Sequence, residues 1–148
     1  MAENFDIESL KRPRSFGARN FLVPGSLKNR VIGDACTGYS IQISGLSYRT
    51  TWVATIEDII LKVNGVEVPK NIMLFCVNNK KFLVSQLKEL FAEAWFALDL
   101  PEIAVNQIGG LPKGEYDIEV TLMRRSDFGY THEFPANPVT DRGTFTVA

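Results

Sequence analysis

The chain has 148 residues, of which 45% are hydrophobic, and its 16 Lys and Arg against 17 Asp and Glu give a formal net charge of -1. A chain of this length can bury a core large enough to fold without disulfide or metal staples. One histidine and two cysteines are too few ligands for the usual zinc sites, and the spacing of Cys36 and Cys76 gives neither a disulfide framework nor a redox pair. We expect both cysteines to be small buried hydrophobic residues.

The N-terminal part of the chain is basic, since residues 1–30 carry six basic and three acidic groups, a charge of +3 against -4 for the remainder. We expect residues 1–15 to form a basic arm and residues 16–148 to form a single domain. The pI of about 5.9 lacks the domain-wide basic footprint that nucleic-acid binding favours. No apolar run reaches the roughly 18 residues of a membrane span, and the N-terminus is too polar for a secretory signal. The sequence therefore predicts a cytoplasmic protein with no nucleic-acid or membrane partner.

The first clear strand pattern covers residues 37–46, where Tyr39 and two isoleucines alternate with polar side chains. This period of two predicts a half-buried strand. Farther along, Asn64-Gly65 separates two short apolar runs and is a preferred dipeptide of type I′ hairpin turns. Residues 78–80, with the sequence Asn-Asn-Lys, separate a second pair of apolar runs. We expect a tight hairpin at each of these turns.

Residues 85–94 predict the helix of the chain, because leucines, Phe91 and an alanine recur there at spacings of three and four behind a capping serine. We expect residues 95–100 to be extended again. Residues 103–109 then form a broken alternation that includes Ile108 and ends at a pair of glycines.

The clearest alternation follows at residues 116–123, and it predicts a strand with one packed and one solvated face. Residues 124–142 contain glycine, asparagine and two prolines, so they predict a long loop before a final strand at 144–147. Together these patterns predict an all-β fold, an antiparallel β-sandwich of about eight strands with one short helix. An immunoglobulin-like and a jelly-roll strand order both fit.

A search for catalytic motifs finds no G-x-S-x-G, no Walker P-loop, no H-E-x-x-H and no G-x-G-x-x-G. The glycine-rich residues 109–114 lead into a strand, so they predict a turn rather than a phosphate cradle. The adjacent carboxylates Glu57 and Asp58 lie in an extended segment, where neighbouring side chains point to opposite faces, so we expect them to be solvated. His132 has no nucleophile in its sequence context, and we expect it to make contacts rather than to catalyse. No catalytic residue and no metal ligand is predicted in this chain.

Two stretches combine aromatic side chains with arginine or histidine, the residue types that anchor protein interfaces. They are residues 46–52 and residues 128–135. The contact residues that we predict at a partner interface or an active-site entrance are Tyr48, Arg49, Trp52, Tyr130, His132 and Phe134. In the alternative interpretation, the aromatic residues cap the ends of the sandwich.

The order of these features resembles the small β subunit of bacterial C-glycoside deglycosidases, from about residue 16 to the C-terminus. The resemblance is carried by Tyr48-Arg49, by Ile56-Glu57-Asp58-Ile59 with the Asn64-Gly65 turn, and by the segment from Gly110 to Val120. It implies a heteromeric enzyme whose larger α subunit resembles sugar-phosphate isomerases, a (β/α)8 barrel that carries a divalent metal, Mn or Mg. This chain would hold no cofactor and would not be active alone.

The substrate that the resemblance implies is a 3-oxo C-glycoside of a flavonoid or related phenolic, whose carbon–carbon bond is cleaved by metal-assisted elimination on the α subunit. The β chain would support assembly and the active-site entrance. Two other functions stay open from the sequence: a stand-alone carbohydrate-binding sandwich that uses Trp52, Trp95 and Tyr130 as stacking platforms, and a purely structural subunit.

Overall fold

The computed structural model describes residues 20–44, 50–125 and 137–148, with the side chain of Asn137 left out. Their strands form two main sheets and a two-stranded ribbon, and every pairing is antiparallel. The five-stranded sheet has the order β1 (Lys28–Ile32), β2 (Ala35–Gln42), β9 (Glu102–Asn106), β6 (Met73–Val77), β7 (Lys80–Leu83). The four-stranded sheet has the order β11 (Asn137–Val147), β10 (Gly114–Arg124), β4 (Ile56–Val63), β5 (Val66–Glu67).

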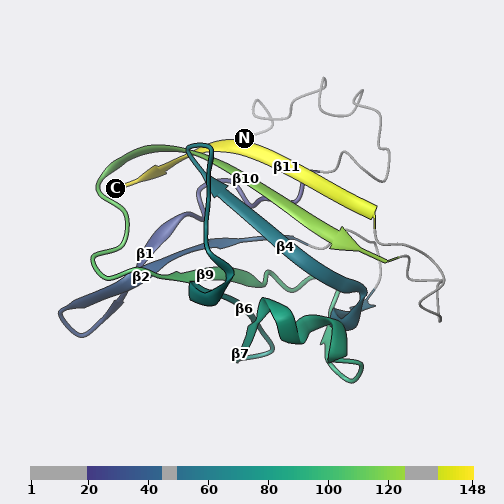
Figure 1. Ribbon diagram of the computed structural model, residues 1–148. Coiled ribbons are helices and arrows are strands. Elements are labelled where there is room, and N and C mark those ends of the chain that lie inside the picture. Colours follow the sequence, from purple (N-terminus) through teal and green to yellow (C-terminus); the bar gives the residue numbers. More distant parts are fainter. Residues whose placement is uncertain (1–19, 45–49, 126–136) are drawn as a thin grey trace.

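The two sheets face each other, with β4, β10 and β11 above the five-stranded sheet in Figure 1. The ribbon pairs β3 (Thr51–Trp52) with β8 (Ala94–Trp95). The described residues also form three short 3-10 helices: η2 (Val53–Thr55), η3 (Lys70–Ile72) and η4 (Val84–Glu89). The predicted all-β antiparallel sandwich is therefore confirmed. Among the described residues, no helix has the length and apolar character needed for a membrane crossing.

The core lies between the inner faces of the two sheets. On β10, Ile118, Val120 and Leu122 are fully buried, as the alternation predicts, and they oppose β4 in register. On the other sheet, Ile41 pairs with Ile103 across β2 and β9, and both are buried. Each such side chain stabilises the fold by roughly 1.5–3 kcal/mol through removal of apolar surface from water.

Both predicted hairpins are confirmed. Asn64 and Gly65 have φ values of 50° and 80°, and Asn78 and Asn79 have values of 54° and 59°. Positive φ at both central residues is the mark of the type I′ turn, which matches the twist of the flanking strands. The second turn is one residue shorter than expected, since Lys80 already pairs with Val77 as the first residue of β7.

The predicted helix over residues 85–94 is wrong in type and length. The structure has the 3-10 helix η4, in which Val84 and Leu87 are buried and Leu90 packs against the core. A 3-10 helix repeats every three residues, so the spacing of these three side chains places them on one stripe. Phe91 falls outside that stripe and is 63% exposed.

Three other expectations from the sequence are also corrected. Of residues 95–100, Trp95 is extended in β8, but the residues after it are not, because the amide of Asp99 donates to the carbonyl of Phe96 in a turn. Ile108 lies in a further turn and is 97% exposed. Ser40 in β2, which the alternation places on a solvated face, is instead buried. The strand β1, which has no alternating pattern, was not predicted.

The predicted loop over residues 124–142 is wrong for its last part. β11 begins at Asn137 and pairs with β10 along its whole length, from Arg124 opposite Asn137 to Gly114 opposite Val147. Pro138 is tolerated because β11 is an edge strand, where a missing N–H donor need not break the ladder. Residues 126–136 lie outside the described residues, as does the predicted boundary between arm and domain at residue 15.

Candidate functional site

Trp52 is the one predicted contact residue that the structure describes. Its backbone is fixed by pairing with Ala94 and by the hydroxyl of Thr55, which donates to the Trp52 carbonyl at 2.7 Å. Its indole is 56% exposed and does not belong to the hydrophobic core. Trp52 therefore does not cap the core. The other five, Tyr48, Arg49, Tyr130, His132 and Phe134, lie outside the described residues.

Trp95 occupies the opposite face of the same ribbon and is 3% exposed. Its ring meets Phe75 edge-on, with centroids 6.0 Å apart, and its Nε1 donates to the carbonyl of Asp99 at 3.4 Å. A buried indole cannot stack on a ligand in solvent. Trp95 is thus a core residue, and its predicted use as a carbohydrate platform is wrong.

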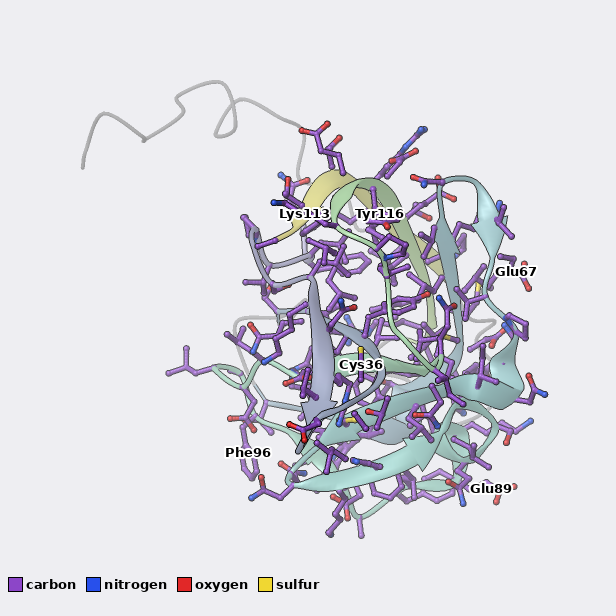
Figure 2. The ribbon with its side chains drawn as sticks, turned by 90° about the vertical axis from the view of Figure 1, so that its left-hand side faces the viewer. Cys36, Glu67, Glu89, Phe96, Lys113 and Tyr116 are labelled. Atoms are coloured by element: carbon purple, nitrogen blue, oxygen red, sulfur yellow. The ribbon has the colours of Figure 1, made fainter. Side chains whose placement is uncertain are left out.

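Several exposed apolar side chains lie on the ribbon or within five residues of it in the chain. Trp52, Phe91 and Phe96 are the exposed aromatic residues of the described chain. We call the five exposed residues of this surface the ribbon patch: Trp52, Phe91, Phe96, Leu98 and Leu100. Figure 2 shows the Phe96 ring at the outer edge of the molecule. Sequence reasoning missed Phe91 and Phe96 because it assigned them to a helix and to an extended strand.

Polar contacts hold the ribbon against the five-stranded sheet. Asn78, in the turn between β6 and β7, donates from its Nδ2 to the carbonyl of Ala94 at 2.8 Å and to Glu93 Oε2 at 3.1 Å. Lys80 also donates to the Glu93 carboxylate. Hydrogen bonds from Lys80 and Asn78 lower the pKa of Glu93 below its ordinary value, so the carboxylate stays charged at neutral pH. The ribbon is therefore a positioned element rather than a loose loop.

The end of β10 is joined to the same region through Arg125. Its backbone amide donates to the carbonyl of Thr55 at 2.8 Å, and its guanidinium donates to the carbonyl of Ala54. Its Nε lies 3.3 Å from Glu57 Oε1. Arg125 is the last described residue before residues 126–136. The end of β10 therefore contacts η2, the short helix that directly follows the ribbon strand β3.

The other candidate sites have structural roles. Glu57 pairs with Arg125, whereas Asp58 pairs with Lys70 at 3.1 Å, so each carboxylate has its own cation. Gly109 and Gly110 form a turn with φ of 87° and 63°, as predicted. In the described chain, no group of three or more His, Cys, Asp or Glu side chains is arranged to hold a metal ion. Cys36 and Cys76 are partly exposed rather than buried, and both are free.

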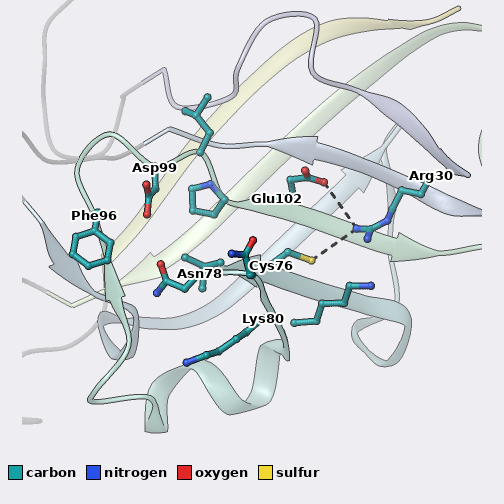
Figure 3. Close-up of a pocket in the computed structure, with 12 residues that line it drawn as sticks. Arg30, Cys76, Asn78, Lys80, Phe96, Asp99 and Glu102 are labelled. Carbon is teal, nitrogen blue, oxygen red and sulfur yellow. Dashed lines mark hydrogen bonds and ion pairs between the residues drawn. The ribbon is translucent and has the colours of Figure 1, made fainter. Parts of the chain in front are cut away.

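A second feature of the surface is a polar hollow next to the β6–β7 turn, with a volume of about 630 Å³. Arg30, Cys76 and Glu102 lie along it, and Figure 3 shows the Arg30 side chain directed toward the other two. No motif in the sequence points to this hollow, because its residues come from segments far apart in the chain.

Comparison with known proteins gives the family. Residues 18–128 match the family described as "C-glycoside deglycosidase beta subunit". The chain belongs to this β-subunit family. It is also 27% identical over 90 residues to the C-glycoside deglycosidase beta subunit of Arthrobacter globiformis, a match that covers 60% of this chain and 67% of that protein. The part matched to the β-subunit family contains the whole ribbon patch and ends before Tyr130, His132 and Phe134.

Proposed function

We propose that this chain is the small subunit of a heteromeric C-glycoside deglycosidase, and that it binds a larger α subunit on which the reaction takes place. The ribbon patch carries this proposal. Trp52 lies on the positioned ribbon, and the other exposed aromatic residues of the described chain, Phe91 and Phe96, lie within three residues of it in sequence. Aromatic anchors dominate binding energy at protein interfaces.

The fixed backbone of the ribbon favours binding, because little conformational freedom is lost when a partner covers a surface that is already ordered. The Asn78 and Lys80 contacts to the segment 93–94 supply that order. In the proposed complex the ribbon patch packs on the α subunit, and the β chain contributes to the entrance of the active site.

The chemistry proposed for the complex is that of a carbon–carbon lyase acting on 3-oxo C-glycosides with flavonoid or related phenolic aglycones. The α subunit is proposed to be a (β/α)8 barrel that resembles sugar-phosphate isomerases and holds Mn or Mg. The ketone at C3 acidifies the C2 proton, which a base on the α subunit removes. The C1–C2 double bond then forms as the bond from C1 to the aryl carbon breaks, and the aryl carbon takes up a proton. The metal of the α subunit would supply stabilisation for the negative charge that develops on the substrate oxygen atoms.

Within this scheme the β chain has no cofactor of its own and contributes assembly and the active-site entrance. Its two free cysteines are usual for a protein of a reducing compartment, which supports the proposed cytoplasmic location.

The direct test is reconstitution from purified chains. Mixed with the α subunit, the β chain is expected to form a complex that buries more than about 2,000 Å² in total, the range of permanent hetero-complexes. Cleavage of a 3-oxo C-glycoside is expected from the mixture and not from the β chain alone. Two independent size-exclusion peaks at micromolar concentration, or turnover by the β chain alone, would contradict the proposal.

His132→Ala separates a contact role from a catalytic one. A direct general acid or base contributes about a hundredfold or more to rate, so the variant complex is expected to retain turnover within that factor of the parent. A larger loss in kcat, in a complex that assembles normally, would make His132 a catalytic residue and would move part of the chemistry to this chain.

A further inference from the structure

The outer edge of the four-stranded sheet differs from the other edges of the two main sheets. β11 forms this edge, has 11 residues and pairs with β10 without a register shift (Figure 1). Among the other outer strands, β5 has only 2 residues, β1 has a register shift after Arg30, and β7 has 4 residues that include Lys80 and Lys81. Short length, bulges and lysines are the usual means by which an edge strand avoids pairing with another chain. β11 has none of these three.

Pro138 and Asp141 are the residues of β11 that disfavour pairing at an edge, but neither blocks the central part of the strand. Pro138 is the second residue of β11, and the rest of the strand has no proline. Asp141 lies opposite the buried Val120, so it faces the inner side of the sheet. Its Oδ2 accepts from the amides of Phe21 and Leu22, each at 2.8 Å. The carboxylate therefore has its hydrogen-bond partners within its own chain.

The even-numbered residues of β11 direct their backbone groups away from β10. The amide of Asp117 donates to Asn64 and its carbonyl accepts from Asn64, so the backbone groups of this β10 residue point toward β4. Because this direction alternates along a strand, the next residue, Ile118, bonds to β11 at its odd-numbered partner Gly143. Pro138, which lacks an N–H, stands at an even position, as an outward direction requires. Among the described residues, no backbone hydrogen bond joins β11 to a segment other than β10.

The sequence of β11 is nearly the same in both directions from Gly143. In an antiparallel pair of two copies centred on this glycine, the opposed residues are Val139 with Val147, Thr140 with Thr146, Asp141 with Phe145, and Arg142 with Thr144. Even positions face even positions, so these outward pairs can exchange two backbone hydrogen bonds each. The amide of Arg142, which donates to Asp141 Oδ1 at 2.8 Å, would exchange that bond for one to the carbonyl of Thr144 in the second copy.

Charge favours this register over its neighbours. A pairing centred on Asp141 or on Arg142 would place like charges directly opposite each other, which destabilises a strand pair. A pairing centred on Thr144 would use a shorter part of β11, since the strand ends soon after that residue. With Gly143 at the centre, the two Arg142 side chains are diagonal neighbours, and each is already paired with Asp117 of its own chain.

We propose that β11 binds a second copy of this chain, by antiparallel pairing about a two-fold axis at Gly143. The two four-stranded sheets then join into one sheet of about eight strands, which is within the ordinary range. The paired residues 139–147 extend over about 30 Å. Such an interface is small, so the dissociation constant is expected to be on the order of 10–100 μM. The inference goes beyond the proposed function, because it needs only the β chain and uses no residue of the ribbon patch.

Sedimentation equilibrium of the full chain tests whether the dimer forms. Between about 5 and 500 μM, the average mass is expected to rise from 16.6 kDa toward twice that value. The mass of a single chain at every concentration would overturn the proposal.

Isotope-filtered nuclear Overhauser measurements on a mixture of labelled and unlabelled chain test the register. The central pair is expected to be a non-hydrogen-bonded one, in which the two Cα atoms lie about 4.5 Å apart. Contacts between the Hα atoms of Gly143 in the two copies, and between the methyl groups of Val139 and Val147, are therefore expected. A dimer without these contacts would overturn the proposal.

Thr144→Pro removes an outward amide that faces the second copy. An edge strand tolerates proline where the N–H is directed outward, so the variant is expected to fold. Its dissociation constant for self-association is expected to be about tenfold higher than that of the parent, because at least one hydrogen bond is lost. Trp52→Ala is the matched control and is expected to dimerise as the parent does. Loss of the dimer in Trp52→Ala but not in Thr144→Pro would overturn the proposal and assign self-association to the ribbon patch.

A charge exchange on the two outer threonines tests the pairing without proline. Both Thr140 and Thr146 are exposed, so charged side chains at these positions are expected to leave the fold intact. The double variant Thr140→Lys with Thr146→Lys opposes like charges twice in the dimer, as does Thr140→Glu with Thr146→Glu. Each is expected to self-associate about tenfold more weakly than the parent, and a mixture of the two is expected to recover association.

Val66→Lys places a lysine on β5, at the opposite edge of the same sheet, and is expected to dimerise as the parent does. Parent-like self-association of the lysine double variant, or no recovery in the mixture, would overturn the proposal. Either result would leave the proposed function standing, because binding of the α subunit is assigned to the ribbon patch and not to β11.

Discussion

The ribbon patch and the outer face of the four-stranded sheet are both exposed in this chain, but they differ in how their side chains meet water. On the sheet, Arg142 pairs with Asp117, Lys62 lies 3.8 Å from Glu119, and polar side chains bond across the strands. In the ribbon patch, three of the exposed side chains are aromatic and two are leucines. A face whose polar groups pair across neighbouring strands is suited to remain solvated, whereas an apolar face on an ordered ribbon is suited to be covered.

The two tryptophans offer the sharpest test of this comparison, and the largest expected effect. Trp95→Ala is expected to lower the free energy of unfolding of the isolated chain by about 3–5 kcal/mol, because it removes a buried ring that packs on Phe75. Trp52→Ala is expected to change it by less than about 0.5 kcal/mol, as is usual for exposed positions. Denaturant unfolding of both variants measures the difference. Equal losses would remove the distinction between a core face and a docking face of the ribbon.

Acidification tests what holds the ribbon in place. The pKa of Glu93 is lowered chiefly by the hydrogen bonds from Lys80 and Asn78, so the stabilisation that it gives is present above its ordinary pKa of 4.5. That stabilisation is lost as the pH falls through the lower, folded-state pKa. The melting temperature of Glu93→Gln is therefore expected to lie below that of the parent at neutral pH and to converge with it in acid. A gap that is independent of pH would show that the Glu93 charge does not anchor the ribbon.

The smallest effect is expected on the four-stranded sheet. Hydrogen bonds between them lower the pKa of Asp117 and raise that of Arg142, but both groups are exposed and screened by solvent. Arg142→Ala is expected to leave the melting temperature of the chain and the dissociation constant of the complex nearly unchanged. A clear loss of assembly in this variant would place the partner on the sheet instead of the ribbon.

The strands were predictable where local pattern and tertiary environment agree. The alternation of β10 and the two asparagine turns specify their structures within a few residues of sequence. β11 was underestimated because Asn137 and Pro138 look like loop signals, although an edge strand tolerates proline. The type of helix was wrongly predicted because apolar residues recur at spacings of both three and four over residues 84–94. Only the packing of the folded chain decides which of these side chains are buried.

The candidate site was less predictable, for a physical reason. The exposure of Phe91 and Phe96 depends on a 3-10 helix and on a turn that place these rings outside the core. The hollow depends on a bulge in β1 that turns Arg30 toward residues far away in the chain. Neither the exposed phenylalanines nor the hollow is marked by a local sequence motif. Trp52 was predicted because aromatic and arginine residues cluster within residues 46–52.

Binding of the α subunit to the Trp52→Ala chain tests the central claim most directly. Trp52 is exposed and does not support the core, so the variant is expected to fold as the parent does. Its affinity for the α subunit, measured by titration calorimetry, is expected to fall by about 2 kcal/mol or more, roughly thirtyfold. Val66→Ala, a change at a still more exposed apolar residue beside the β4–β5 turn, is expected to bind as the parent does. Parent-like affinity of Trp52→Ala, with Phe91→Ala and Phe96→Ala behaving likewise, would contradict the assignment of the ribbon patch as the partner surface.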